Sequence, residues 1–284
     1  MQSPNAQNEE LFHAFEQAGW ESIPKQYDDG FGRLTSQAIE PLLDAAEVAA
    51  GTRVLDVATG PGYVAAAAAS RGALVVGVDF AAAMVAEARR RHPALDFRMG
   101  DAEELPFPND AFDAVVMNFG MLHLARPDQA IAEARRVLRP GGRFAFTVWA
   151  NPEHTIGFGI VLNAVRAHGN MDVPLPAGPP FFRFSDTDEC VRTLLEIGFA
   201  QPSVTRIQQI WRLDSPDALY EIMSRGTVRT AGLLRAQTPD ALSAIRGAVR
   251  NATASLQNGD AFELPMPAVL ASARRPVERS VAEA

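Results

Sequence analysis

Three acidic side chains stand where successive apolar runs end, and a glycine-rich turn accompanies the first of them. Asp56 lies within VLDVATGPG, Asp79 ends VVGVD, and Asp101 follows FRMG. Acids at the carboxyl ends of neighbouring parallel strands can accept hydrogen bonds from the ribose hydroxyls or the amino groups of a ligand. The pattern therefore predicts a small-molecule site at one edge of a sheet.

The glycine turn after Asp56 allows two interpretations. Gly60–Ala65 reads GPGYVA and matches the G-x-G-x-x-[G/A] pattern of dinucleotide sites, so an NAD(P)-dependent oxidoreductase is one of them. Two observations disfavour it: Asp56 lies close to a turn that would have to hold an anionic pyrophosphate, and Asp-Val-Ala-Thr separates the apolar run from the glycine. An acid near the turn suits a cationic or neutral ligand better.

Two histidines follow predicted strands on the ligand side and are candidate general bases. His123 follows MNFGML and His154 follows WANPE, whereas an ordinary hydrogen-bonded loop histidine is the alternative for each. Arg183, within FFRF, is a candidate for gripping an anionic group of an acceptor. The remaining histidines are predicted to be surface, packing or helix-capping residues: His13, His92 and His168.

The elements that must position these groups alternate between strand and helix. Apolar runs predict strands at 54–57, 75–79, 97–99, 113–118 and 143–149, and helical patterns lie at 9–20, 33–50, 63–71, 81–92 and 127–138. On 9–20 the predicted apolar face holds Leu11, Phe12, Phe15 and Ala18. Strands joined by helical crossovers predict an α/β fold with a doubly wound parallel sheet.

The pattern changes after residue 150. A helix is predicted at 154–168, a proline-rich loop or lid at 172–184, a helix from Ser185 with Asp188 in its first turn, and strands at 203–211 and 267–274. SPD at 215–217 and TPD at 238–240 each predict a hydroxyl N-cap. Residues 214–260 thus form a helical insert between the last two strands, and we expect a cap over the site, with core covering or a dimer contact as alternatives.

Composition limits the classes of function. The chain has 284 residues, a net charge of −8, 47% apolar residues and a single cysteine, so an internal disulfide is excluded and a cysteine-based metal site is not expected. The charge argues against steering to nucleic acid or to anionic lipid. MQSPNAQNEE has no secretory pattern and no run of 18 apolar residues exists, so we expect a cytoplasmic protein without membrane insertion.

The motifs together resemble a known family. VLDVATGPG, VVGVDF, GDAEELPFPNDAFDAVV and RVLRPGGRFAF are similar to the successive motifs of class I S-adenosylmethionine-dependent methyltransferases, nearest to the ubiquinone/menaquinone-biosynthesis type. The resemblance covers about residues 33–150. It implies a seven-stranded Rossmann-like sheet with the last strand antiparallel, and an N-terminal helical segment, 1–32, that folds over the cofactor. The core would be 33–213 and 261–276, followed by a disordered tail at 277–284.

The resemblance also implies roles for individual residues toward S-adenosylmethionine and its product S-adenosylhomocysteine. Gly60 and Gly62 would pack under the methionine part, with Asp56 supporting the turn and reaching the amino group. Asp79 would hold the ribose and Asp101 the adenine edge. The other expected cofactor contacts are Tyr27, Ala58, Phe80, Met84, Ala102, Asn118 and Phe119. In the same N-terminal segment Trp20 and Phe31 accompany Tyr27.

We therefore expect methyl transfer to a small, partly apolar molecule by in-line displacement. The sulfonium already activates the methyl group, so holding and orienting the acceptor is the main task, with His123 or His154 assisting as a base. A non-catalytic protein that binds S-adenosyl ligands is the second alternative beside the oxidoreductase. The acceptor, the methylated atom and the oligomeric state, a homodimer included, stay open.

Overall fold

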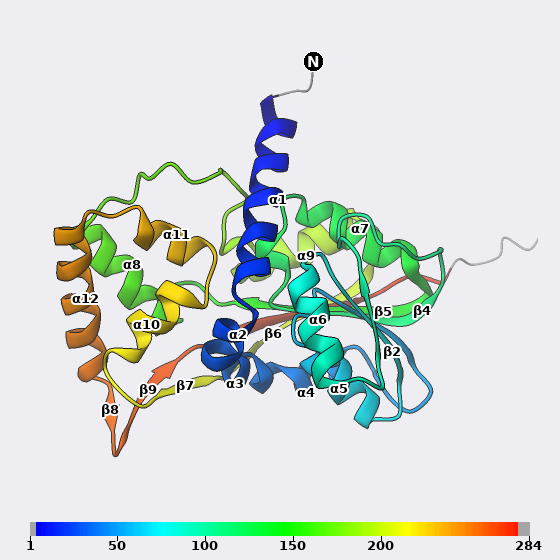
Figure 1. The fold of residues 1–284 in the computed structure, drawn as a ribbon. Helices are drawn as coiled ribbons and strands as arrows, with labels where there is room; N and C mark the ends of the chain where they lie inside the picture. Colours follow the sequence, from blue (N-terminus) through cyan, green and yellow to red (C-terminus); the bar gives the residue numbers. More distant parts are fainter. Residues whose placement is uncertain (1–3, 278–284) are drawn as a thin grey trace, which may run out of the picture.

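A seven-stranded sheet forms the centre of the computed structural model, which describes residues 4–277 (Figure 1). The strand order is β3-β2-β1-β4-β5-β10-β6, and β10 runs antiparallel to both of its neighbours while the pairs among β1–β5 are parallel. This confirms the predicted sheet and its antiparallel last strand. The strands are β1 Arg53–Val57, β2 Leu74–Asp79, β3 Asp96–Met99, β4 Phe112–Asn118, β5 Leu138–Trp149, β6 Ala200–Ile207 and β10 Ala268–Arg274.

The central strands are apolar on both faces because helices cover both sides of the sheet. Val54 packs in a cluster with helix α4 and α5 residues, whereas the adjacent Leu55 packs in the cluster that includes α7. Because successive side chains of a strand point to opposite faces of the sheet, each central strand contributes to both clusters. The helices along this part are α4 Ile39–Ala45, α5 Tyr63–Ser70, α6 Ala82–Arg91, α7 Pro127–Val137 and α9 Thr187–Glu196.

The N-terminal segment is one long helix followed by short turns. Helix α1 spans Pro4–Ser22, and the turns after it are α2 Pro24–Tyr27, η1 Asp28–Gly32, α3 Arg33–Thr35 and η2 Ser36–Ala38. The predicted helix at 33–50 is therefore broken and ends at Ala45. The predicted apolar face of α1 is only partly right, because Phe12 is buried but Leu11 is 54% exposed and Glu16 is fully buried.

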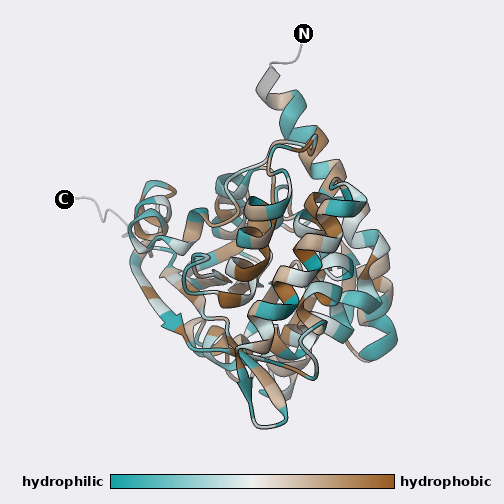
Figure 2. Cartoon of the chain, turned by 90° about the vertical axis from the view of Figure 1, so that its left-hand side faces the viewer, coloured by the Kyte–Doolittle hydropathy of each residue, from teal (hydrophilic) through white to brown (hydrophobic). Residues whose placement is uncertain are grey.

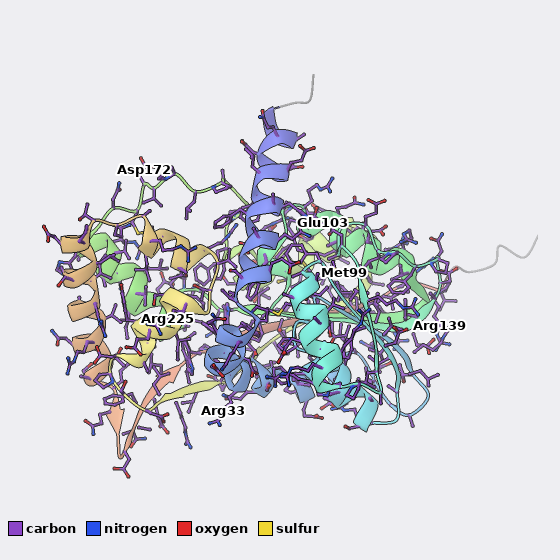
Figure 3. The ribbon with its side chains drawn as sticks, in the orientation of Figure 1. Arg33, Met99, Glu103, Arg139, Asp172 and Arg225 are labelled. Atoms are coloured by element: carbon purple, nitrogen blue, oxygen red, sulfur yellow. The ribbon has the colours of Figure 1, made fainter. Side chains whose placement is uncertain are left out.

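A second group of elements lies beside the sheet. Helix α8 (Ile156–His168) packs against α12 (Pro239–Ala254), and α10 (Ala218–Arg225) and α11 (Arg229–Arg235) complete the group. In Figure 1 these helices gather on the left, and α1 stands between them and the sheet. Figure 3 shows the same division, with Asp172 and Arg225 on the helical side and Arg139 at the far end of the sheet.

A small second sheet corrects the prediction of one strand at 203–211. That segment splits into β6, in the main sheet, and β7 (Ile210–Leu213), which pairs with β9 (Ala261–Pro265). β8 (Gln257–Asn258) completes the second sheet, order β7-β9-β8. The insert also holds three helices rather than two. The break falls at Gln208 and Gln209, and the sequence did not reveal it because strand propensity says nothing about which sheet a segment joins.

The predicted helix starts have mixed outcomes. Thr238 caps α12 as predicted, with its hydroxyl accepting a hydrogen bond from the Ala241 N–H at 3.3 Å. Helix α9 is capped by Asp186 instead of Ser185, whose hydroxyl donates to the Phe182 carbonyl in the short turn η4 (Arg183–Ser185). Helix α10 begins after Asp217 without a side-chain cap, so the prediction at Ser215 was wrong.

Most of the buried residues are apolar, and the ribbon coloured by hydropathy shows apolar and polar stretches alternating along the helices (Figure 2). Among the described residues, no helix is both long and apolar enough to cross a membrane. The predicted tail at 277–284 lies, except for the exposed Val277, outside the described residues.

A pair of glycines tests how tightly the sheet packs beneath the glycine turn. A Cβ at Gly77, in β2, would lie 2.6 Å from the Phe97 ring and 2.8 Å from Thr59 Oγ1, so Gly77→Ala should lower the free energy of unfolding by about 1–3 kcal/mol. Gly247 lies inside α12 with open space around its Cβ position, so Gly247→Ala should raise the free energy of unfolding by about 0.4–1 kcal/mol. Urea unfolding of both variants measures the contrast, and equal effects would contradict the packing.

Candidate functional site

The strand order reverses between β1 and β4, and a large pocket opens at the carboxyl ends of these strands. β1 has β2 on one side and β4 on the other. The loops that follow β1 and β4 therefore lead to opposite sides of the sheet and leave a crevice between them. The pocket is partly open to solvent. Its walls come from the sheet, α1, the short turns after it and the insert.

The glycine turn at the end of β1 has a left-handed backbone. Ala58, Gly60 and Gly62 have φ values of 54°, 52° and 87°. A Cβ at Gly60 would meet nothing within 4 Å, whereas one at Gly62 would lie 2.8 Å from the Phe97 ring. Ala58 and Gly60 line the pocket, but Gly62 does not. Gly62 is therefore required for packing at the start of α5 and only Gly60 is open to a ligand.

Asp56 lies beneath the turn and is buried. Its Oδ2 accepts hydrogen bonds from the Thr59 hydroxyl at 2.6 Å and from the Ala65 N–H at 3.0 Å, and Oδ1 has no hydrogen bond within the described residues. Burial raises the pKa of Asp56 to about 7, although both hydrogen bonds oppose the shift. Of the two roles that the resemblance implied, the position supports turn bracing. Asp56 does not line the pocket, and its expected reach to a ligand amino group stays a prediction.

Asp79 ties the turn to the next strand and also faces the pocket. Its Oδ2 accepts from the Gly60 N–H at 2.9 Å and its Oδ1 from the Ala81 N–H at 3.0 Å. Burial raises the pKa of Asp79 to about 6, against the effect of these backbone hydrogen bonds. A buried carboxylate with lone pairs left over can accept hydrogen bonds from a diol, as predicted for a ribose.

The wall beyond Asp79 is a slot with apolar sides and one acid. Phe80, Met84, Ala102 and Asp101 all line the pocket, as the sequence predicted. Asp101 Oδ1 accepts from the Glu103 N–H at 2.8 Å, and Asp101 Oδ2 lies 3.5 Å from His13 Nε2 of α1. A flat heterocycle with an amino group fits such a slot.

Glu103 also approaches His13 and Asp101, and one ligand atom from each of the three lies within 4.8 Å of the others. Glu103 is, however, already engaged by Arg126, which donates to it from its backbone N–H and from Nε, both at 2.8 Å. We interpret the cluster as a hydrogen-bonding group between α1 and the loop after β3 and not as a metal centre.

The end of β4 gives the next part of the wall. Asn118 Nδ2 donates to the Thr35 carbonyl at 3.1 Å, and Asn118 Oδ1 accepts from the Thr147 hydroxyl at 2.6 Å. Phe119 has a φ of 56° and stacks on Trp149 with ring centroids 4.1 Å apart. Both residues line the pocket as predicted, and the side chain of Asn118 is mainly occupied with holding its neighbours.

Aromatic rings enclose the remainder of the pocket. Tyr27 stacks on Phe31, its hydroxyl lies 3.2 Å from Thr35 Oγ1, and burial raises its pKa to about 12. Sequence reasoning did not assign Trp149, Phe158 and Phe181 to the site, because nothing local marks which rings face a pocket. Beyond Tyr63 and Phe80, the aromatic lining residues are Trp20, Tyr27, Phe31, Phe119, Trp149, Phe158 and Phe181, and residues 226–230 of the insert also line the pocket.

His123 is the histidine that the fold brings into the pocket. It ends the turn η3 (Met121–His123), and its Nδ1 lies 3.0 Å from Glu16 Oε2 of α1. The ring of Trp20 lies nearly perpendicular to the imidazole, at a centroid distance of 4.7 Å. Nothing in the sequence pattern of α1 marked Glu16 as a partner, because a buried acid on a helix has no local signature.

The structure does not bring His154 to the site. After β5 the chain turns away at Asn151, whose Oδ1 contacts His154 Nδ1, and His154 is exposed and absent from the pocket walls. Arg183 is also elsewhere, since it pairs with Asp128 at 2.8 Å and with Glu189 at 2.6 Å. Neither residue lines the pocket, and the sequence did not reveal this because strand order alone does not tell where a loop turns.

These walls fit an S-adenosyl ligand in its three parts. Asp79 offers acceptors for a diol, the slot around Phe80 and Met84 fits a base, and the open Gly60 allows close backbone approach. The GPGYVA stretch fits a pyrophosphate less well, because two buried acids hold the turn. The geometry favours a nucleoside with a cationic or neutral extension over a dinucleotide.

Sequence comparison finds methyltransferases. A family model described as a methyltransferase domain matches residues 55–146. A demethylmenaquinone methyltransferase of Renibacterium salmoninarum is 32% identical over 171 residues, 57% of this chain and 72% of the relative. Another, of Beutenbergia cavernae, is 42% identical over 134 residues, 45% of this chain and 55% of the relative. The chain thus spans between about half and three quarters of these relatives.

Solved structures share the fold at low identity. A putative methyltransferase of Bacillus halodurans matches with a TM-score of 0.54 and 19% identity, over 84% of this chain and 98% of that one. The phosphoethanolamine N-methyltransferase 2 of Haemonchus contortus, solved with S-adenosylhomocysteine, matches with a TM-score of 0.55 and 20% identity, over 93% of this chain and 60% of that one. A [4+2]-cyclase matches with a TM-score of 0.51 and 21% identity, over 85% of this chain and 82% of that one. The fold by itself therefore does not determine the reaction.

The position of Asp79 leads to a binding prediction. Asp79→Asn keeps the size of the side chain but removes the charge that would strengthen hydrogen bonds from ribose hydroxyls, so S-adenosylhomocysteine should bind roughly 10- to 100-fold more weakly. Calorimetric titration measures this, with NAD as the control ligand, for which no binding is expected. Unchanged affinity in a folded variant would rule out the ribose role.

The buried acid beneath the turn leads to a pH prediction. The folded-state pKa of Asp56, about 7, exceeds its ordinary value of 3.8, so its contribution to stability is full below about pH 4 and is lost as the pH rises through 7. Asp56→Asn cannot ionise, so the stability of the parent relative to the variant should fall by on the order of 1–4 kcal/mol between pH 4 and pH 8. Urea unfolding at several pH values tests this, and a constant difference would contradict it.

The motifs, the sheet with its antiparallel last strand and the relatives agree with one another. A relative at 32% identity is matched over 72% of its length, and a family model covers the segment that carries the acids and the glycine turn. The chain therefore belongs to the class I S-adenosylmethionine-dependent methyltransferases and is similar to their ubiquinone/menaquinone-biosynthesis type.

Proposed function

We propose that the chain transfers the methyl group to a small, partly apolar molecule bound in the aromatic part of the pocket, with His123 as the general base. The observation that supports this most is the continuity of one pocket. It joins the predicted cofactor residues, from Gly60 to Phe119, with the aromatic rings and His123. The oxidoreductase interpretation is not favoured, since the matched relatives are methyltransferases.

The two parts of the pocket have different chemistry. The part that would hold S-adenosylmethionine, which supplies an electrophilic methyl group on a sulfonium when bound, comes from the carboxyl ends of β1–β3 and from the start of α6. Its residues are Ala58, Gly60, Asp79, Phe80, Met84, Asp101 and Ala102. The rings of Trp20, Phe158 and Phe181 would position an acceptor and exclude water. Orientation of this kind can contribute on the order of 7–11 kcal/mol. Aromatic faces also favour a nearby cationic sulfur by roughly 0.5–2 kcal/mol.

The acceptor of this chain does not follow from the names of its relatives. The relatives are named for demethylmenaquinone, and the family model ends at residue 146, whereas Trp20, Phe158 and the 226–230 segment lie outside 55–146. We therefore propose an apolar, ring-containing acceptor, with demethylmenaquinone as one member of the test panel. The insert at 214–260, in this proposal, caps the acceptor part, because Gly226–Thr230 lines it.

Several finer expectations belong to the same proposal. A net charge of −8 supports a small-molecule acceptor over nucleic acid. A single, buried cysteine suits the reducing cytoplasm. Self-association through the insert stays a prediction, which light scattering would test.

A pair of histidine variants tests the general base. His123→Asn retains a donor for Glu16 but no base, so kcat should fall roughly 10²–10⁴-fold with little change in S-adenosylhomocysteine affinity. His154→Asn is the matched control and should leave kcat unchanged, because His154 lies outside the pocket. The assay follows S-adenosylhomocysteine release over an acceptor panel of phenols, naphthols, quinols and amines. Equal rates for His123→Asn and the parent would overturn the role of His123.

A further inference from the structure

A buried carboxylate on the N-terminal helix connects three parts of the molecule at the pocket wall. Glu16 of α1 has no exposed surface. Its Oε2 lies 3.0 Å from Nδ1 of His123, on the core, and its Oε1 lies 3.2 Å from Nε of Arg229, at the start of α11 in the insert. Burying a carboxylate is costly unless it is paired, so this contact set must serve the local structure or the site.

The contact determines how the imidazole of His123 is used. A carboxylate only accepts hydrogen bonds, so Nδ1 of His123 must carry the proton that Glu16 receives. In the neutral ring Nε2 is then unprotonated, and no hydrogen bond to Nε2 is present within the described residues. Since His123 lines the pocket, its basic nitrogen is left for a molecule bound there. An acid at Nδ1 with a bare Nε2 is the arrangement that a general base requires.

Arg229 balances the charge on the other side of Glu16. Its guanidinium lies over the rings of Phe12, at 4.4 Å, and of Phe181, at 5.6 Å, and one of its Nη atoms donates to the Pro179 carbonyl at 3.0 Å. Burial lowers the pKa of Arg229 and Glu16 opposes this shift, and arginine remains charged in proteins. The carboxylate thus has a permanent cation on one oxygen and is available to His123 with the other.

We infer that Glu16 is a positioning residue that sets the tautomer and orientation of His123, and that the acceptor is therefore an aromatic hydroxyl compound. The inference rests on the proposed function, in which His123 is the base. A neutral amine needs no base before methyl transfer, whereas an acidic hydroxyl does. Trp20 and Phe181 lie nearly perpendicular to the His123 ring, at centroid distances of 4.7 and 6.1 Å, and supply the apolar surface on which a flat ring carrying this hydroxyl would pack.

The proton and electron balance of the step is simple. Nε2 of His123 takes the hydroxyl proton while the acceptor oxygen forms its bond to the methyl carbon, and the electron pair of the broken S–C bond stays on sulfur. Glu16 stabilises the imidazolium that results, without itself being protonated, and the proton then leaves to solvent.

The test starts with the protein alone. Nitrogen-15 NMR of histidine-labelled protein reports which imidazole nitrogen carries the proton, and the parent should show His123, identified by its loss in His123→Asn, as the Nδ1–H form. Glu16→Gln, nearly isosteric, should raise the Nε2–H share. Glu21→Gln changes another α1 carboxylate, which accepts from the first N–H groups of α6, and is the matched control, for which the Nδ1–H form should persist. An Nε2–H form in the parent, or equal shifts in the two variants, would overturn the positioning role.

Kinetics with 2-naphthol, against 2-naphthylamine as the amine probe, test the acceptor class. Glu16→Gln should lower kcat for 2-naphthol roughly 10- to 100-fold, with KM and S-adenosylhomocysteine affinity within about twofold. Methylation of 2-naphthylamine but not of 2-naphthol would overturn the hydroxyl class while the NMR result stands. Failure of the proposed function differs from both, because then no member of the full acceptor panel is methylated whatever the tautomer.

Discussion

Two buried carboxylates at the carboxyl ends of β1 and β2 are the constraint on which the site depends. Asp56 and Asp79 together accept hydrogen bonds from Thr59, Gly60, Ala65 and Ala81. These contacts hold a left-handed turn that the backbone would not otherwise keep. Because the turn lies where the strand order reverses, its open glycine faces the pocket. The burial that raises the pKa of both acids is the cost of this preorganisation.

Helix α1 completes the site through a polar face. His13, Glu16, Gln17 and Glu21 follow the i, i+3, i+4, i+8 spacing of one helix side, so all four reach the core from the same direction. Gln17 donates to the Phe80 carbonyl, and Glu21 accepts from the first N–H groups of α6. The helix is therefore held by the loops that build the cofactor slot, and Glu16 extends this attachment to His123 and the insert. The proposed cofactor slot and the proposed base, His123, are consequently both in contact with one helix.

The division of the pocket matches what methyl transfer demands. One part, rich in backbone groups and acids, belongs to the segment shared with the relatives, and the other, lined by rings, comes largely from segments outside it. The first can remain constant because the donor is constant. The second can change with the acceptor, since orientation and exclusion of water need only shape and apolar surface.

The sequence by itself determined the sheet and its helical crossovers, and most of the residues that it proposed as cofactor contacts line the pocket. Those signals are local: strand alternation, a glycine turn and acids at strand ends act through the nearest residues. Only the tertiary structure decided that His123 faces the pocket while His154 turns away, that Arg183 pairs with Asp128, and that Glu16 contacts His123. It also decided that 203–211 divides between two sheets. These outcomes depend on contacts between loops and helices that are far apart in the sequence. Residue types and their local spacing do not predict such contacts.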